Sequence, residues 1–200
     1  MPQDTFSPDY FMPASKHSLK SILEAMLLVA DRPIGLKKFG QLLPEYDRGA
    51  IITTLKILQR EYRDEKRGFE LKEVAGGFRL QTRKDLRNWL LRLKRSSPAR
   101  LSRAALETLA VVAYRQPVTR ADIETIRGVD ASGTLNFLLN RKIIRIVGRK
   151  PLPGRPLLYG TTRQFLEIFE LKDLSDLPSL AEMTELECEA NDLPQIPLFR

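Results

Sequence analysis

Few residues in this sequence have the types and spacing that catalysis requires. The chain holds one histidine, His17, and one cysteine, Cys188. A Cys/His zinc cluster and an intramolecular disulfide are therefore excluded, and a Ser-His-Asp triad is poorly supplied. No histidine stands near Cys188 in the sequence to act as its base, which argues against a nucleophilic role. The sequence predicts no catalytic residue and no metal site.

The glycines do not form a phosphate-binding loop. Gly76-Gly77 is not followed by the Lys-Ser/Thr pair of a P-loop, and Gly154 stands alone among prolines. Both positions are interpreted as turns. We therefore expect no cofactor, and a protein that is not an enzyme.

Charge is the property that varies most along the chain. The net charge is +8, divided into −2 over residues 1–15, +17 over 16–163 and −7 over 164–200. A basic body attracts polyanions such as nucleic acid, and an acidic end can shield that body or dock elsewhere. Solvated helix faces and a solubility tail would explain the same pattern, so charge alone leaves both interpretations open.

The apolar residues are too scattered for a membrane span. Hydrophobic residues make up 42% of the chain, but the longest apolar run, Ala25 to Ala30, is only six residues long. About 20 are needed to cross a bilayer. The first 16 residues carry acids and prolines where a signal peptide needs a positive start and an apolar stretch. We expect no membrane contact and a cytoplasmic protein.

The sequence contains an internal repeat. ILEAMLLVADR (22–32) matches ALETLAVVAYR (105–115) at a shift of 83 residues, and Phe39 then falls on Ile123. Further on, FRLQT (78–82) falls on LYGTT (158–162). The chain is therefore interpreted as a tandem of two units, each of about 75 residues.

Both units show the same order of elements, three helices followed by a β-hairpin and a last helix. Helical periodicity predicts the helices, and a change to period two between Gly- and Pro-rich turns predicts the hairpins. In the first unit we expect helices over 19–30, 36–43, 51–63 and 85–94, and strands over 69–74 and 78–82. In the second we expect helices over 103–114, 120–126, 131–141 and around 165–169, and strands over 143–148 and 157–161.

This order is that of a winged helix, so the predicted fold is mainly α with small β-hairpins (α+β). We expect two tandem winged-helix domains and a flexible acidic tail. The expected limits are a flexible N-terminus at 1–16, a first domain at 17–95, a linker at 96–102, a second domain at 103–172 and a disordered tail at 173–200. Helix starts are predicted at Ser18, at Thr82 with Asp85, at Thr119 with Asp122 and at Thr161 with Gln164.

The third helix of the second unit is a poor candidate for reading DNA bases. ASGTLNFLLNRK carries no cation before Arg141, at its C-terminal end. Ala131, Ser132 and Gly133 leave a small-residue surface at its start, which fits either internal packing or the close approach of a partner.

The wing of the second unit is strongly basic. Its cations are Arg145, Arg149, Lys150 and Arg155. They are candidate contacts for phosphates, of the non-specific kind that weakens steeply with salt, and a solvated basic loop is the alternative.

Several motifs in the second unit, taken together, resemble one family. They are IRGVD (126–130), IIRIVGRK (143–150), PGRPLLYGTT (153–162), FLEIF (165–169) and DLSDLPSL (173–180). In order and spacing they closely resemble the segregation and condensation protein B family, over about residues 17–180. Two departures are Glu170, where the family usually has Gly, and a wing that opens PLPGRP and not with an acidic residue.

The resemblance implies a non-catalytic accessory subunit of the bacterial SMC condensin complex. Such a subunit forms a homodimer, mainly through its first winged helix, and binds the ScpA-type kleisin, which links the SMC ATPase heads. It implies a role in chromosome condensation and segregation, in the cytoplasm and associated with the nucleoid. By motif position, the candidate partner contacts are Arg127, Gly128, Val129, Phe137 and Tyr159. Val129 and Phe137 could equally belong to the core.

The alternative function is a DNA-binding transcriptional regulator built from two winged helices. The near absence of cations on the helix over 131–141 argues against it. The accessory-subunit interpretation predicts at most weak DNA binding that is insensitive to sequence.

Overall fold

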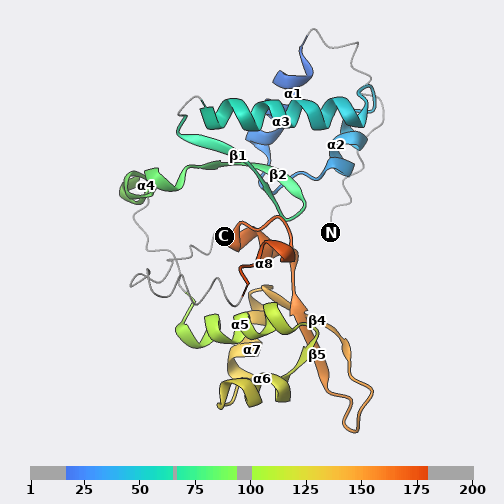
Figure 1. Cartoon of the computed structure of the whole chain (residues 1–200), viewed down its shortest axis with the longest axis vertical. Helices are drawn as coiled ribbons and strands as arrows, with labels where there is room; N and C mark the ends of the chain where they lie inside the picture. Colours follow the sequence, from blue (N-terminus) through green and yellow to red (C-terminus); the bar gives the residue numbers. More distant parts are fainter. Residues whose placement is uncertain (1–16, 65–66, 94–100, 180–200) are drawn as a thin grey trace, which may run out of the picture.

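The computed structural model describes residues 17–64, 67–93 and 101–179. It is a mixed α/β structure whose described residues form eight α-helices and two small antiparallel sheets. Residues 17–93 carry α1 (Leu19–Val29), α2 (Leu36–Leu42), α3 (Arg48–Asp64), β1 (Phe69–Val74), β2 (Gly77–Thr82), the 3-10 turn η1 (Lys84–Leu86) and α4 (Arg87–Leu93). Residues 101–179 carry α5 (Arg103–Arg115), β3 (Val118–Thr119), α6 (Arg120–Arg127), α7 (Ser132–Asn140), β4 (Ile144–Arg149), β5 (Leu157–Thr161), α8 (Arg163–Phe169) and the 3-10 turn η2 (Leu174–Asp176). We call these two parts the first half and the second half (Figure 1).

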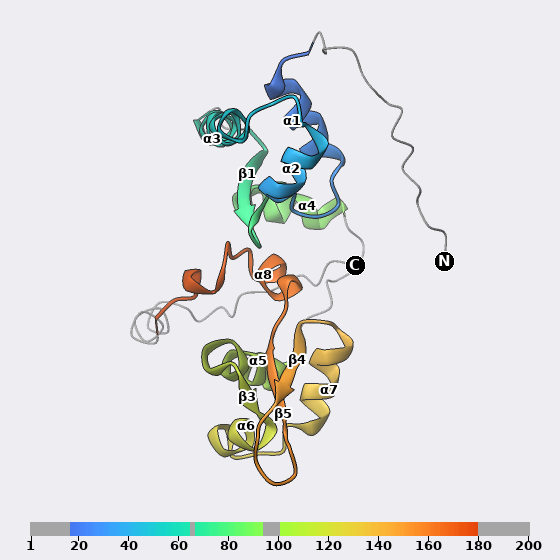
Figure 2. The same cartoon turned by 90° about the vertical axis from the view of Figure 1, so that its right-hand side faces the viewer.

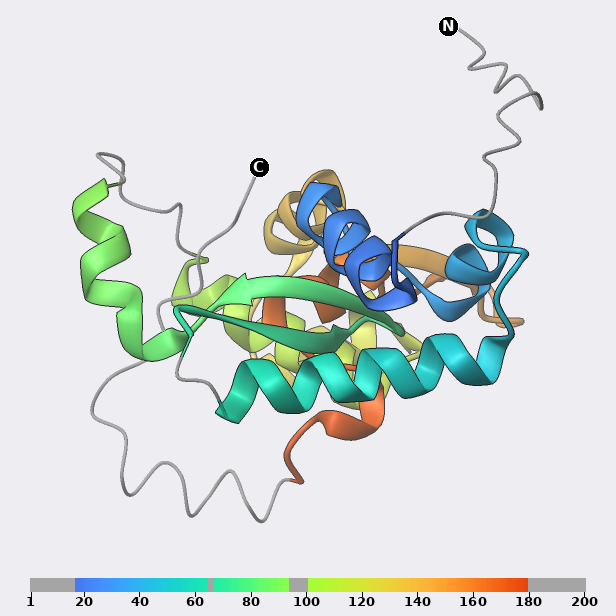
Figure 3. The ribbon, with the colours of Figure 1, turned by 90° about the horizontal axis from the view of Figure 1, so that it is seen from above.

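The core of the first half lies between its three helices and its hairpin. Ile51, Leu55 and Leu58 recur every three or four residues along α3, so they share one buried face of that helix. Phe39 of α2 is fully buried against the same cluster. Seen from above, α3 runs along the hairpin strands, with α1 on the opposite side (Figure 3). As predicted, Ser18 caps α1, because its Oγ accepts a hydrogen bond from the Ser21 N–H at 3.2 Å.

A two-residue turn closes the first hairpin. β1 and β2 pair in register from Phe69↔Thr82 to Val74↔Gly77, and the turn residues Ala75 and Gly76 have φ of 52° and 68°. Two positive φ values give the turn the twist that antiparallel strands need. Gly77 is required for a different reason: a Cβ there would lie 2.9 Å from the backbone of Ile34, which forms a β-bridge with Phe78.

The second half packs its helices against a three-stranded sheet of order β3-β5-β4. β3 is only two residues long, and the periodicity of the sequence does not reveal it. Its residue Val118 pairs with Tyr159 on the central strand. Thr119 then caps α6 in the predicted capping box with Asp122, whose pKa is held below its ordinary value by the hydrogen bonds from Thr119.

Two predicted helix caps are wrong for the same reason. Thr82 and Thr161 both lie within paired strands, opposite Phe69 and Ile144, so neither can turn its side chain toward a following helix. η1 instead begins after Arg83 without a side-chain cap. The cap of α8 is Thr162, one residue later than predicted, and its Oγ1 accepts from the Phe165 N–H at 3.3 Å.

The predicted repeat holds closely in the second helix of each half and is displaced elsewhere. Phe39 and Ile123, which the repeat equates, are both fully buried. In the first helices, buried Leu27 would correspond to Ala110, which is exposed. In the hairpins, Phe78 and Tyr159 make the equivalent strand contacts, so the predicted match of 78–82 to 158–162 is off by one residue.

Part of the predicted acidic tail packs against the second half. Leu177 contacts its core, and the Tyr114 hydroxyl donates a hydrogen bond to the Pro178 carbonyl at 2.7 Å. The remaining tail residues at 180–200, which include Cys188, lie outside the described residues, as do 1–16, 65–66 and 94–100. None of the helices in the described ranges is long and apolar enough to cross a membrane.

Candidate partner-binding surfaces

The corner between α6 and α7 is shaped by a glycine. Gly128 has φ of +69° and ends α6, donating its N–H to the Glu124 carbonyl at 2.8 Å. This left-handed conformation favours glycine because other residues carry a Cβ that crowds the backbone. The turn directs the chain away from α6, so that Val129 is 54% exposed.

Arg127 makes its contacts within the second half. Its side chain is only 8% exposed, and its guanidinium donates to Thr108 Oγ1 at 2.8 Å and to Glu107 Oε2 at 3.1 Å. The hydrogen bonds from Arg127 and Arg103 hold the pKa of the Glu107 carboxyl below its ordinary value. Arg127 thus connects α6 to α5, and little of its side chain is left for a partner.

The exposed apolar residues of the second half include two of the predicted contacts. Val129 is 54% exposed and Phe137 is 38% exposed, so the alternative that they are ordinary core residues is wrong. Arg141 lies over the Phe137 ring, with its guanidinium carbon 5.5 Å from the ring centroid. Sequence reasoning missed Ile126, which is 55% exposed on the same corner as Val129. Its signal was present: an apolar residue placed directly before the Arg-Gly end of an amphipathic helix.

Tyr159 has the opposite environment. It lies on the central strand β5 between Val118 and Ile146, is 7% exposed, and belongs to the core of the second half. Little of its side chain is therefore left for direct contact with a partner. The small residues at the start of α7 have different environments. Ala131 is fully buried, whereas a Cβ on Gly133 would point into open space.

The basic wing extends from the second half as the β4–β5 hairpin (Figures 1 and 2). Arg145, Arg149 and Arg155 are exposed and Lys150 is half-buried. Two of the arginines donate to backbone carbonyls, Arg145 to Thr161 and Arg149 to Arg155. None of the ion pairs found in the described ranges includes any of the four, but the charge of Lys150 acts on the Asp122 carboxylate and helps to lower its pKa. The charges of the three arginines are open to an anion.

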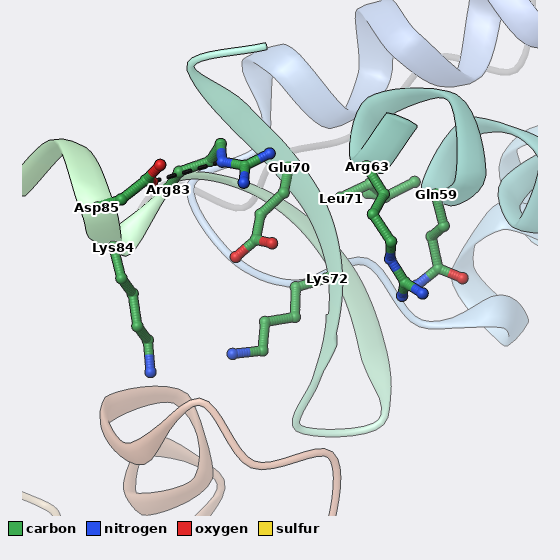
Figure 4. Close-up of a pocket in the computed structure, with 8 residues that line it drawn as sticks. All are labelled: Gln59, Arg63, Glu70, Leu71, Lys72, Arg83, Lys84 and Asp85. Carbon is green, nitrogen blue, oxygen red and sulfur yellow. Dashed lines mark hydrogen bonds and ion pairs between the residues drawn. The ribbon is translucent and has the colours of Figure 1, made fainter. Parts of the chain in front are cut away.

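A polar hollow of about 520 Å³ lies in the first half (Figure 4). Four cations and two acids contribute to its walls. It is lined by Gln59, Arg63, Glu70, Leu71, Lys72, Arg83, Lys84 and Asp85. Lys72 and Lys84 point away from the hairpin toward the ribbon of the C-terminal part of the second half (Figure 4). The sequence shows Arg83 and Lys84 as neighbouring cations beside Asp85, but it does not reveal the cluster, because the other residues come from α3 and β1 and meet them only on folding.

A second unpredicted surface is the short helix α4. Trp89 is 64% exposed and Leu93 is 83% exposed, and Arg92 lies over the Trp89 ring at 4.5 Å. The repeat equates Trp89 with Phe169, but only Phe169 packs on a core, beside Phe165 with ring centroids 4.8 Å apart. α4 projects to one side of the first half (Figure 3).

Exposed surfaces, not an enclosed cavity, carry the candidate chemistry of this molecule. Across the described residues no group of three or more His, Cys, Asp or Glu side chains could hold a metal ion. Apolar side chains at the α6–α7 corner and on α4, with cations on the wing, are typical of a binding subunit.

The comparisons with known proteins agree on one family. The family model described as segregation and condensation complex subunit ScpB matches residues 21–180, and this chain belongs to that family. Segregation and condensation protein B of Syntrophotalea carbinolica is 51% identical over 175 residues, covering 88% of each chain. The protein of that name from Moorella thermoacetica is 45% identical over 166 residues, covering 83% of this chain and 85% of its own.

A solved structure also matches part of the chain. It is described as a dimer of the ScpB N-terminal domain complexed with ScpA peptide. The two are 32% identical, over 38% of this chain and 93% of the solved one, with a TM-score of 0.35.

Proposed function

We propose that this chain is a non-catalytic accessory subunit of an SMC condensin complex. In this proposal it forms a homodimer, binds the ScpA-type kleisin and through it the SMC ATPase, and acts in chromosome condensation and segregation in the cytoplasm, on the nucleoid. The observation that carries the proposal is the family match over residues 21–180, which spans both halves.

We further propose that each half is a winged-helix domain, the first over residues 17–95 and the second over 103–172. Each half has three helices, an antiparallel hairpin and a final helix in that order. The Ile34–Phe78 bridge in the first half and the Val118–Tyr159 pair in the second place the segment after the first helix against the hairpin in the same way. Shared order and shared pairing support a common fold.

The kleisin surface is proposed to lie at the α6–α7 corner. Ile126, Val129 and Phe137 offer exposed apolar side chains there and on α7. An extended, partly apolar segment gains affinity by burying such residues. Arg127, Gly128 and Tyr159 contribute to this surface by fixing the helix end and the sheet beneath it.

The homodimer contact is proposed to lie on the first half, with α4 as part of it. Trp89 and Leu93 are the most exposed large apolar residues of that helix. Aromatic side chains in this setting are the residue type that most often anchors protein interfaces. Burial against a second copy would remove both from water.

The test is co-purification with the ScpA-type kleisin, followed by a mass measurement of the complex. We expect a complex with two copies of this chain to one kleisin. Val129→Asp should weaken kleisin binding, whereas Leu152→Asp is the matched control because Leu152 is 49% exposed at the wing tip, away from the corner. Equal binding by both variants would contradict the placement of the surface, and failure of the unaltered chain to bind would contradict the function.

Weak contact of the wing with DNA is a secondary part of the proposal. The wing cations Arg145, Arg149, Lys150 and Arg155 support it, whereas α7 exposes Gly133, Asn136, Phe137 and Asn140 and no cation within its span. A shift assay over a salt series should show weak binding that ignores sequence and disappears as salt rises. Strong sequence preference near physiological salt would favour the transcriptional regulator.

A further inference from the structure

The segment that follows α8 joins the two halves through its backbone. The Ala75 N–H donates to the Leu171 carbonyl at 2.8 Å, and the Gly76 N–H donates to the Lys172 carbonyl at 3.0 Å. The side chain of Leu171 packs on the core of the second half. Residues 170–172, which we call the strap, therefore bind the hairpin turn of the first half with one side and their own core with the other (Figures 1 and 2).

One carboxylate on the strap gathers donors from three elements of the first half. Glu170 Oε2 lies 2.8 Å from Lys72 Nζ on β1, 3.2 Å from Lys84 Nζ on η1 and 3.4 Å from Gln81 Nε2 on β2. Lys72 and Lys84 are the two cations of the polar hollow that point toward the strap (Figure 4). Glu170 thus supplies the counter-charge for one side of the hollow.

Two further side-chain contacts cross the same junction. Lys172 Nζ lies 3.7 Å from the carboxylate of Glu73, and Arg163 donates from its guanidinium to the Pro33 carbonyl at 2.9 Å. Each involves a single pair, and the Lys172 side chain is half exposed. Glu170 is the one strap side chain that contacts three elements across the junction, with only about a quarter of its surface exposed.

The backbone of Glu170 shows that its side chain is held there against a local cost. Its φ is +57°, in the left-handed region that favours glycine, at the end of α8. A glutamate keeps this conformation only when surrounding contacts compensate for it. Within the second half, the Leu171 N–H donates to the Leu166 carbonyl at 2.9 Å at this helix end. The contacts of the Glu170 side chain with Lys72, Lys84 and Gln81, all in the other half, add to this compensation.

We propose that Glu170 is the positioning residue that fixes the orientation of the second half relative to the first. With the carboxylate in place, the hairpin turn and the strap stay hydrogen-bonded and the halves move as one body. Without it, two backbone hydrogen bonds at the hairpin turn and two single-pair contacts remain, and the halves separate and reorient. If the proposed function holds, a kleisin that contacts both halves then meets a prearranged surface and loses less entropy on binding.

The test measures the junction in the chain alone, without kleisin. Spin labels at Thr53 on α3 and Asn136 on α7, both exposed and one in each half, report the distance between halves, with Cys188 replaced by serine. Labelled chains are diluted with an excess of unlabelled ones, so that a homodimer adds no second distance. We expect one narrow distance peak at about 0.1 M salt that broadens near 1 M, where charges are screened within about 3 Å.

Two substitutions test the role of the Glu170 carboxylate without disrupting the helix end. Glu170→Gln removes the charge. Glu170→Gly removes the whole side chain and favours the left-handed helix end, so α8 stays formed. Both should lose the narrow peak at about 0.1 M salt. Glu61→Gln is the matched control, because Glu61 is about as exposed as Glu170 and its ion pair with Lys20 lies within the first half.

A narrow peak retained in both Glu170 variants, or a broad distribution in the unaltered chain at low salt, would overturn the proposal. The same broadening in Glu61→Gln would also overturn it, because the effect would then not depend on the junction. None of these outcomes depends on kleisin binding, so failure here and failure of the proposed function are told apart.

Discussion

Arg127 provides the sharpest test of whether a conspicuous cation belongs to a partner surface or to the fold. Arg127→Ala removes a guanidinium that is 8% exposed and that bonds to the fully buried Thr108. A hydrogen bond from a charged donor contributes about 1.5–3 kcal/mol. The contact with the half-exposed Glu107 adds little, because solvent screens it.

Two further effects determine the size of the change. Truncation also removes the two packed methylene groups Cγ and Cδ, at about 0.8 kcal/mol each. In the opposite direction, Arg127 Nε is buried without a hydrogen-bond partner, and its removal returns about 1 kcal/mol. The expected loss in the free energy of unfolding is therefore about 3 kcal/mol. In a domain of 60–100 residues, each kcal/mol lowers Tm by about 4–8 °C.

The assay is thermal and urea unfolding beside a matched control. Arg120→Ala removes an arginine from the same helix, but Arg120 is 55% exposed and pairs with Glu124 at four residues' spacing, a pair that contributes only a few tenths of a kcal/mol. If Arg127→Ala is no less stable than Arg120→Ala, the reasoning that places Arg127 in the fold is refuted. If it is destabilised as expected, any loss of kleisin binding well below its Tm would have to come from the surface itself.

The remaining predictions concern the turns and the junction. Gly128→Ala should destabilise the chain by about 1–2 kcal/mol in urea unfolding, because φ of +69° crowds a Cβ; an unchanged midpoint would contradict this. Gly77→Ala should lower the free energy of unfolding by about 1–3 kcal/mol, since the new Cβ would lie 2.9 Å from the Ile34 backbone. An unshifted melting curve would contradict this, because it would mean that the strand moves away at no cost. Burial raises the pKa of the Glu170 carboxyl, but the hydrogen bond and charge of Lys72, with Lys84, outweigh it and hold the pKa below its ordinary 4.5. The contribution of Glu170 to the junction is therefore complete above about pH 4.5 and is lost as the pH falls through the lowered pKa of the folded state. The spin-label peak should stay narrow from neutral pH to about 5 and broaden only at lower pH. Broadening above about pH 5 would show that another group is responsible.

Local periodicity and turn chemistry determined the elements of this protein. The stripes on α3 and on the second helix of each half, the Ser18 cap and the Thr119–Asp122 capping box all depend on residues within one or two turns of each other, and all are found where the sequence predicts them. The same local signals failed at Thr82 and Thr161. There, strand pairing with residues 13 and 17 positions away competes with the cap and wins.

The roles of the site residues were decided by tertiary structure. The Arg-Gly motif in the sequence pointed to the α6–α7 corner. It did not predict that Arg127 contacts Thr108 in the interior while Phe137 is exposed to solvent, because burial depends on what the other helices cover. Lys72 and Glu170 are 98 residues apart in the chain and 2.8 Å apart in space. No local pattern encodes such a contact, since it exists only when two separately formed cores dock, and that is why the junction between the halves could be found only in the folded molecule.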